Sequence, residues 1–146
     1  VRVSLIILGA EDTPYGSELK MLAVRLGVSD AVEWRPFVSG PELIDEFFRA
    51  DGYISMGRDE NFCIAAAEAL CLGMPVVCSD TVGIGEVVDR YEMGQVCSLN
   101  PMDAAVAVQA VMKLNQSNRQ QIKEQARRLF NKKSIAEKFL EEVSGI

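Results

Sequence analysis

The sequence contains no histidine, no long hydrophobic run and no excess of basic residues. The lack of histidine removes the commonest general base and metal ligand from these 146 residues. Chemistry in this chain must therefore use carboxylates, amides or hydroxyls, or another part of the protein. Cysteine is present at Cys63, Cys71, Cys78 and Cys97, without a CxxC spacing and always in apolar segments. This pattern is typical of buried thiols in a reducing compartment, and we expect neither disulfides nor a zinc site.

The short hydrophobic runs and the charge exclude further classes of protein. No apolar stretch approaches the ~18 residues that a membrane-spanning helix needs. The opening VRVSLIILGAED predicts a strand bounded by a turn rather than a cleavable signal. The formal net charge of −6 argues against the basic surface that binds nucleic acid. We therefore expect a cytoplasmic protein without a nucleic-acid partner.

Short apolar segments alternate with helical patterns along the chain. The predicted strands are 3–8, 32–34, 53–55, 76–78 and 95–97. The predicted helices are 17–26, 41–49, 62–72, 86–90, 104–114, 119–130 and 135–143. Gly27 and Gly73 mark helix ends, and Ser39 is a candidate cap before Pro41.

The alternation predicts an α/β fold: a Rossmann-like open parallel sheet of about five strands, flanked by helices and followed by a helical C-terminal tail. We expect a single domain over residues 1–146, with the parallel core in 1–100 and the tail in 101–146. In such sheets, ligands bind in the loops beyond the carboxyl ends of the strands.

The stretch ENFCIAAAEAL, residues 60–70, carries a carboxylate at each end of a small, apolar helix start. Glu68 would share a helical face with Ile64 and Leu72. An ionised carboxylate on a buried apolar face costs several kcal/mol unless donors meet it. The hydroxyl groups of a ribose would meet it. The alternative is that this face is the exposed edge of the helix.

Glu60 precedes the same helix, so both carboxylates would face one crevice. The helix start has unpaired backbone N–H groups and a favourable dipole, which suit an anion such as a diphosphate. These groups belong to Asn61, Phe62, Cys63 and Ile64. A solvated loop position is the alternative for Glu60. Taken together, the pattern predicts a nucleotide-sugar site.

These residues also resemble a known family. Glu60 and Glu68 are separated by seven residues, then come an Ala-rich helix, the strand start GMPVV at 73–77 and the turn GIGEVV at 83–88. In this order and spacing they resemble the C-terminal half of retaining glycosyltransferases of the two-domain GT-B fold, glycosyl transferases group 1. The likeness extends to LIILGAED, LGVSDAVEWRPFV and FRADGYIS and covers roughly residues 3–115.

The resemblance implies a role for each candidate residue. Glu60 would be the catalytic residue, next to donor-sugar hydroxyls near the reacting carbon, and Glu68 would hold the ribose. The amides of 61–64 would face the diphosphate. Gly9 would allow close approach of the nucleotide. The loop along the base would consist of Pro36, Phe37 and Val38.

The implied reaction transfers a hexosyl group from a UDP- or GDP-type sugar to an acceptor with retention of configuration. It uses the nucleotide-diphosphate sugar as substrate, with neither a metal nor a separate cofactor. The family's acceptor-binding N-terminal domain is not in this sequence, so we expect a piece of a two-domain enzyme that is inactive alone. Membrane association of the complete protein and self-association are left open.

Three positions depart from the family pattern. Asn61-Phe62-Cys63 replaces Gly-Phe-Gly, Gly57 stands where serine is usual, and Pro36 replaces a common glycine. These changes would narrow the pocket and weaken donor binding. The family's diphosphate-binding Arg and Lys are also missing; Arg35 and Arg58 are candidate substitutes, although a surface role is favoured for each.

Other classes of function fit the sequence less well. A dinucleotide-binding domain would need a GxGxxG turn at its first helix, and GIG at 83–85 is only a late fragment of it. Related sugar-nucleotide epimerases use a histidine that this chain lacks. The serious alternative is a catalytically degenerate, Rossmann-like structural or interaction domain, whose unpaired sheet edge binds another subunit.

Overall fold

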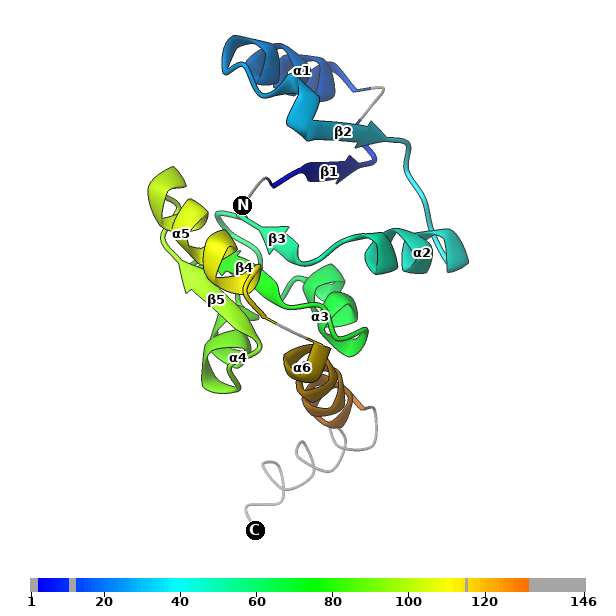
Figure 1. Ribbon diagram of the computed structural model, residues 1–146, viewed down its shortest axis with the longest axis vertical. Helices are drawn as coiled ribbons and strands as arrows, with labels where there is room; N and C mark the ends of the chain where they lie inside the picture. Colours follow the sequence, from blue (N-terminus) through cyan, green and yellow to red (C-terminus); the bar gives the residue numbers. More distant parts are fainter. Residues whose placement is uncertain (1–2, 11–12, 115, 132–146) are drawn as a thin grey trace. The chain divides into compact units, whose positions relative to one another are not determined.

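The computed structural model describes residues 3–10, 13–114 and 116–131. The predicted helix at 135–143 therefore lies outside the described residues. Contacts within the chain define two compact units, residues 1–50 and 51–146. Each unit contains a parallel sheet with helices on it, as Figure 1 shows.

In the first unit, β1 (Leu5–Leu8) pairs in parallel with β2 (Val32–Arg35). The crossover between them contains α1 (Pro14–Arg25) and a 3₁₀ turn, η1 (Ser29–Ala31), because parallel neighbours cannot be joined by a tight hairpin. The side chain of Thr13 caps α1 by accepting a 2.9 Å hydrogen bond from the Gly16 amide.

Helix α2 (Pro41–Arg49) completes this unit and begins with proline at its first position. The prediction that Ser39 caps this helix is wrong. The cap is Gly40, which has a φ of 59° and makes no side-chain capping bond. A left-handed residue leads the chain into the helix here, and glycine adopts that conformation without steric cost.

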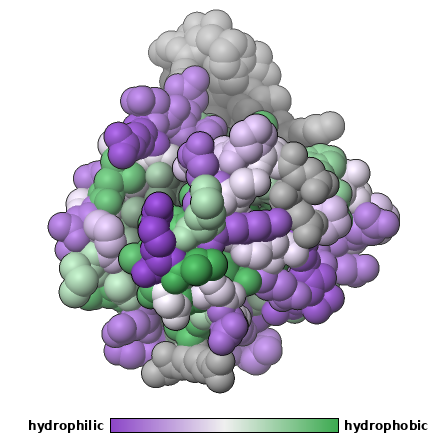
Figure 2. Space-filling view, turned by 90° about the horizontal axis from the view of Figure 1, so that it is seen from above, coloured by the Kyte–Doolittle hydropathy of each residue, from purple (hydrophilic) through white to green (hydrophobic). Residues whose placement is uncertain are grey.

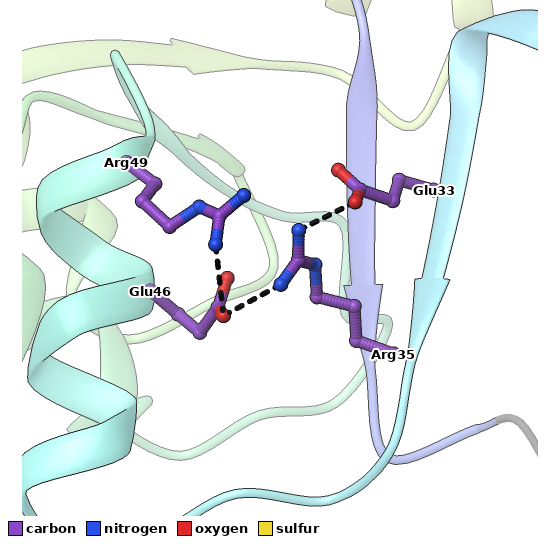
Figure 3. A network of polar contacts seen from close by, with 4 residues as sticks. All are labelled: Glu33, Arg35, Glu46 and Arg49. Carbon is purple, nitrogen blue, oxygen red and sulfur yellow. Dashed lines mark hydrogen bonds and ion pairs between the residues drawn. The ribbon is translucent and has the colours of Figure 1, made fainter.

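An ion-pair network ties α2 to β2. Arg35 Nη1 lies 2.9 Å from Glu46 Oε1, and Arg35 Nη2 lies 2.5 Å from Glu33 Oε1. Figure 3 shows the Arg35 guanidinium between these two carboxylates, with Arg49 approaching Glu46 from the next turn of α2. The Glu46 side chain is only 13% exposed, so the ion pair that joins β2 to α2 is largely buried.

The second unit contains three parallel strands in the order β3 (Tyr53–Ser55), β4 (Val76–Ser79) and β5 (Gly94–Cys97). The central strand β4 is buried along its whole length, as its Val-Val-Cys run predicts. Four helices accompany it: α3 (Ile64–Cys71), α4 (Gly85–Arg90), α5 (Pro101–Val111) and α6 (Gln116–Leu129).

The last two described helices pack on this sheet unit. Val111 and Ala107 of α5 form a buried cluster with Val77 of β4. Helix α6 lies beside α3 (Figure 1), where Arg127 Nε donates a 3.1 Å hydrogen bond to the Cys71 carbonyl. Arg119 Nη2 likewise donates to the Asp51 carbonyl at 2.6 Å. Helix α6 therefore covers both ends of the segment that carries β3 and α3.

The predicted fold class is confirmed: parallel strands alternate with helices. The number of strands among the described residues also agrees with the prediction, with β1 and β2 paired in the first unit and β3, β4 and β5 in the second. Most predicted elements lie within a few residues of the observed ones.

The surface carries hydrophobic and polar residues side by side. Figure 2 shows green hydrophobic groups among purple hydrophilic ones on the face it presents. Among the described residues, no helix is both long enough and apolar enough to cross a lipid bilayer.

Candidate functional site

The loop between β3 and α3 places Glu60 at the carboxyl end of the sheet. The Glu60 carbonyl accepts a 2.9 Å hydrogen bond from the Gly83 amide, and Glu60 forms a parallel bridge with Val82. A β-carbon on Gly83 would lie 1.8 Å from the Asn61 carbonyl oxygen. The glycine-rich turn after β4 is therefore what lets the two loops touch, and this contact fixes the backbone of Glu60.

Two hydroxyl groups at the end of β4 hold the same loop. Ser79 Oγ donates to the Gly57 carbonyl at 2.5 Å, and Thr81 Oγ1 donates to the same carbonyl at 2.8 Å. Ser79 is fully buried. A β-carbon on Gly57 would lie 3.2 Å from that of Glu60, so the side chain that is usual in the family would press on the glutamate.

The Glu60 side chain turns toward the start of α3. Its Oε1 accepts a 3.2 Å hydrogen bond from the Cys63 amide, and Cys63 is the N-cap residue of α3 with a φ of 64°. A carboxylate at a helix N-terminus is stabilised by the unpaired amides and the helix dipole. One of the four amides predicted to meet a diphosphate thus binds Glu60 itself.

The side chains of Phe62 and Cys63 contact other parts of the second unit. The Phe62 ring meets Phe130 edge to face, with centroids 5.9 Å apart. The Cys63 thiol is buried and lies 3.5 Å from Ser55 Oγ on β3. The left-handed backbone at Cys63 explains why glycine is usual here, because residues with a β-carbon rarely adopt positive φ.

Glu68 lies on the exposed face of α3. Its neighbour on that face, Ile64, is 71% exposed, whereas Ala66, Ala69 and Leu70 are buried on the opposite face. The argument that Glu68 costs energy among buried apolar groups is therefore wrong. The alternative interpretation, an exposed edge of the helix, describes this face correctly, because the small residues of α3 put its other sides against the protein interior.

The two glutamates nevertheless both raise the pKa of one group, the Tyr53 phenol. The pKa of Tyr53 is raised to about 12, mainly by burial and to a smaller extent by the nearby Cys63, Glu60 and Glu68. Negative charge beside the phenol opposes its ionisation. The charges of both glutamates are thus felt at the same residue of β3.

The remaining candidate residues belong to the first unit. Gly9 follows β1 with a φ of 80°, and its amide donates a 3.1 Å hydrogen bond to the Arg35 carbonyl. A β-carbon on Gly9 would lie 3.5 Å from the Phe37 ring, and Phe37 is 80% exposed. Pro36 is also exposed and Val38 is half-buried. These residues form one surface at the carboxyl ends of β1 and β2.

The two candidate cations, Arg35 and Arg58, have different surroundings. Arg35 is engaged by Glu33 and Glu46, so its guanidinium is a structural tie rather than a spare diphosphate ligand. Arg58 lies in the exposed loop before Glu60. Within the described ranges, no three His, Cys, Asp or Glu side chains gather closely enough to hold a metal ion.

Two hollows of the second unit lie away from the glutamates. One of about 490 Å³ is bordered by the end of α4, at Arg90 to Glu92, and by residues of α6 such as Asn118 and Gln125. Another of about 320 Å³ lies between β5 and α5. Neither is lined by Glu60 or Glu68.

Sequence reasoning missed Tyr53, Ser79 and Thr81. Tyr53 begins a strand and has an ordinary strand-forming side chain, so no local signal distinguishes it. Ser79 and Thr81 follow a buried strand directly. Hydroxyl residues at the carboxyl end of a strand are a signal that could have found them, because ligand loops start there.

Parallel strands with acidic and glycine-rich loops at their carboxyl ends define an α/β protein of the kind that binds ligands at this edge. A sequence model of the family described as glycosyl transferases group 1 matches residues 1–129. The chain belongs to this family.

Part of the chain is similar in sequence to proteins of known name. An 88-residue stretch is 35% identical to D-inositol 3-phosphate glycosyltransferase of Streptomyces bingchenggensis, covering 60% of this chain and 19% of that protein. The same-named protein of Saccharomonospora viridis is 33% identical over 100 residues, 64% of this chain and 23% of that protein. The match thus spans about a fifth of the length of these relatives.

Solved structures share the fold. Sucrose-phosphate synthase from Thermosynechococcus elongatus superimposes with a TM-score of 0.80 at 19% identity, over 97% of this chain and 38% of that chain. HepE of Anabaena, solved in complex with UDP, gives a TM-score of 0.77 at 20% identity, over 99% of this chain and 41% of that chain. These likenesses show that the chain shares the fold of a part of those proteins.

Proposed function

We propose that this chain is the donor-binding domain of a retaining glycosyltransferase, which transfers a hexosyl group from a nucleotide-diphosphate sugar to an acceptor. The observation that carries the proposal is the Glu60 carboxylate, which the Cys63 amide holds at the start of α3. Membership of the family supports it. The Anabaena protein of the same fold has been solved with UDP and glucose.

In this proposal, Glu60 is the catalytic residue and contacts hydroxyl groups of the donor sugar near the reacting carbon. A carboxylate can accept several hydrogen bonds at once, so the Cys63 amide and sugar hydroxyls can share it. The contacts of Gly83 and Gly57 hold the loop, and this rigidity keeps the carboxylate in place.

Glu68 would bind the ribose. Its position on an exposed face leaves the carboxylate open to the two vicinal hydroxyls of a nucleoside. The diphosphate would lie at the start of α3, next to the amides of Asn61, Phe62 and Ile64, where the helix dipole favours negative charge.

For the nucleobase we propose residues of the first unit, on the family resemblance. The exposed ring of Phe37, flanked by Pro36 and Val38, offers an apolar surface to a nucleobase. Gly9, next to this ring, leaves room for the nucleotide because it has no side chain. The donor is of the UDP or GDP type, and we propose neither a metal nor another cofactor.

We also propose that the chain needs an acceptor-binding domain for turnover. Donor contacts alone lower the barrier little, because the acceptor hydroxyl must be held in line with the sugar carbon. The chain by itself is then expected to bind nucleotides without transferring sugar. Measured transfer by these 146 residues alone would contradict this part of the proposal.

Isothermal titration with UDP, GDP and their sugars tests the donor site. We expect binding that weakens about tenfold in Glu68→Gln, the scale of a hydrogen bond to a charged group. Glu86→Gln is the matched control, since Glu86 is also an exposed helical glutamate of the second unit, paired with Arg90. Equal affinities of the two variants would remove Glu68 from the site.

A folded sample that binds none of these nucleotides would instead favour the degenerate interaction domain. The departures at Gly57 and Cys63 are the observations on which that second candidate rests. A transfer assay on the complete gene product then separates the two, because Glu60→Gln should lower kcat only in an enzyme.

A further inference from the structure

Three side chains form a hydrogen-bonded cluster below the first residue of α3. The Cys63 thiol donates to Ser55 Oγ at 3.5 Å. Tyr53, two residues earlier on β3, is hydrogen-bonded to the same thiol. Because Tyr53 and Ser55 alternate with Ile54 along the strand, both side chains reach the same face of β3.

The cluster contains Cys63, whose backbone conformation is strained. Cys63 has a φ of 64° and is one of two residues other than glycine with positive φ among those described. The β-carbon of an L-residue disfavours this conformation, so it persists only where the surroundings over-determine it. Here the buried thiol is held from β3 while the amide of the same residue is bound by Glu60.

The conformation of Cys63 sets the geometry of the loop before α3. The amide that binds Glu60 and the first amides of the helix all change direction if this residue moves to negative φ. A loop that populates the competent geometry only part of the time has its apparent affinity reduced by that fraction. If the thiol contacts keep that geometry populated, they raise ligand affinity without touching the ligand.

We propose that Tyr53, with Ser55, is a positioning residue of the donor site: by holding the Cys63 thiol it keeps the α3 start in the geometry that binds the nucleotide diphosphate. In this chain, a cysteine held at positive φ takes the place of a glycine, which would adopt that conformation without strain. The inference rests on the proposed function, since it assigns a role toward the same donor site.

The test compares two substitutions that differ by one methyl group. Cys63→Ala removes the thiol contacts but keeps a β-carbon, so the strain remains with nothing to hold it. Cys63→Gly removes both the contacts and the strain. With UDP and GDP as probes for the complete gene product, we expect Kd to rise about fivefold in Cys63→Ala and to stay within about twofold in Cys63→Gly.

The second part of the test measures the same Kd in Tyr53→Phe. We expect an approximately fivefold rise in Kd in the otherwise native protein, and no further rise when it is added to Cys63→Gly. A residue with only a general structural role would weaken binding equally in both backgrounds. Tyr91→Phe, at the end of α4, is the control for loss of a phenol hydroxyl elsewhere in the second unit, and melting temperatures confirm folding of each variant.

The outcomes are distinct. If the native protein binds UDP or GDP and Tyr53→Phe binds equally well, the positioning role is wrong while the proposed function stands. If the native protein binds neither nucleotide, the proposed function fails and the inference fails with it. A crystal structure of Tyr53→Phe in which Cys63 keeps its left-handed φ and its contact with Glu60 would also overturn the inference, whatever the affinities.

Discussion

The Phe62 ring packs edge to face on Phe130, with centroids 5.9 Å apart and planes at 82°. Phe62 lies two residues after Glu60, and Phe130 follows the last turn of α6. A residue near the end of the described chain therefore supports the loop that carries the proposed catalytic carboxylate. Pairs of this geometry are favoured because the positive ring edge meets the negative face.

We predict that Phe130→Ala lowers the free energy of unfolding by about 1 kcal/mol through loss of this pair. Urea denaturation followed by circular dichroism measures the effect. Met102→Ala is the control, because Met102 is 74% exposed on α5 and its truncation should change stability by less than about 0.5 kcal/mol. Similar losses in the two variants would show that the ring contact contributes nothing of its own.

The two glycines of the turn after β4 should respond differently to the same substitution. Gly83→Ala places a β-carbon 1.8 Å from the Asn61 carbonyl oxygen, so the loop must shift at a cost of about 2 kcal/mol. In Gly85→Ala, the nearest atoms lie at 3.6 Å and the residue starts α4, so stability should be unchanged or higher by up to about 1 kcal/mol.

Thermal melts of these two variants provide the comparison, and the donor affinity of Gly83→Ala should fall as well, because the Gly83 amide holds the Glu60 carbonyl. A Gly83→Ala protein with native stability and native affinity would mean that the contact between the two loops is not needed for the site.

In the first unit, the two carboxylates that flank Arg35 should differ in their contribution to stability. Glu46→Gln removes charge from a side chain that is 13% exposed, leaving the Arg35 guanidinium poorly paired, and should cost about 2 kcal/mol. Glu33→Gln alters a carboxylate that is 52% exposed and should cost less than about 1 kcal/mol.

Fluorescence during urea denaturation reports on this unit directly, since Trp34 is the only tryptophan in the sequence and lies between Glu33 and Arg35 on β2. Equal midpoints for the two variants would indicate that the network seen in Figure 3 is as weak as an ordinary surface ion pair.

Stability should also fall in alkaline solution because of buried thiols. Burial, followed by the neighbouring Cys97 and Cys63, raises the pKa of Cys78 from 9.0 to about 11. The folded pKa lies above the unfolded one, so this contribution is fully present below pH 9 and is lost as the pH rises toward about 11.

The free energy of unfolding, measured by urea denaturation from pH 8 to 11, should therefore decline less steeply in Cys78→Ala than in the native protein. Burial also raises the pKa of Cys71 and Cys97, so part of the slope should remain. An unchanged slope in Cys78→Ala would contradict the raised pKa of this thiol.

Much of the fold was predictable because its signals are local. The β-branched run at Val76–Ser79 and the proline at the start of Pro41–Arg49 mark a strand and a helix by their own residues. Gly27 and Gly73 were predicted as helix ends, and both have positive φ. Which strands pair with which was not predictable, since strand pairing depends on contacts between distant segments.

For the candidate site too, one part follows from local sequence and another depends on how the elements pack. The spacing of Glu60 and Glu68 around the start of α3 follows from the sequence, because a loop residue and a helical residue eight positions later are placed by local geometry alone. The exposure of Glu68 does not follow, since an Ala-rich helix reads as apolar on every side until its neighbours are known.

The sequence by itself determined the order of strands and helices, the two carboxylates and the family, because periodicity, turn residues and motif spacing act within short stretches of chain. Only the tertiary structure decided that the Cys63 thiol contacts β3, that Phe62 packs on Phe130 and that Arg35 pairs with Glu46. Those contacts join residues from 8 to 68 positions apart, and their formation depends on how whole elements pack.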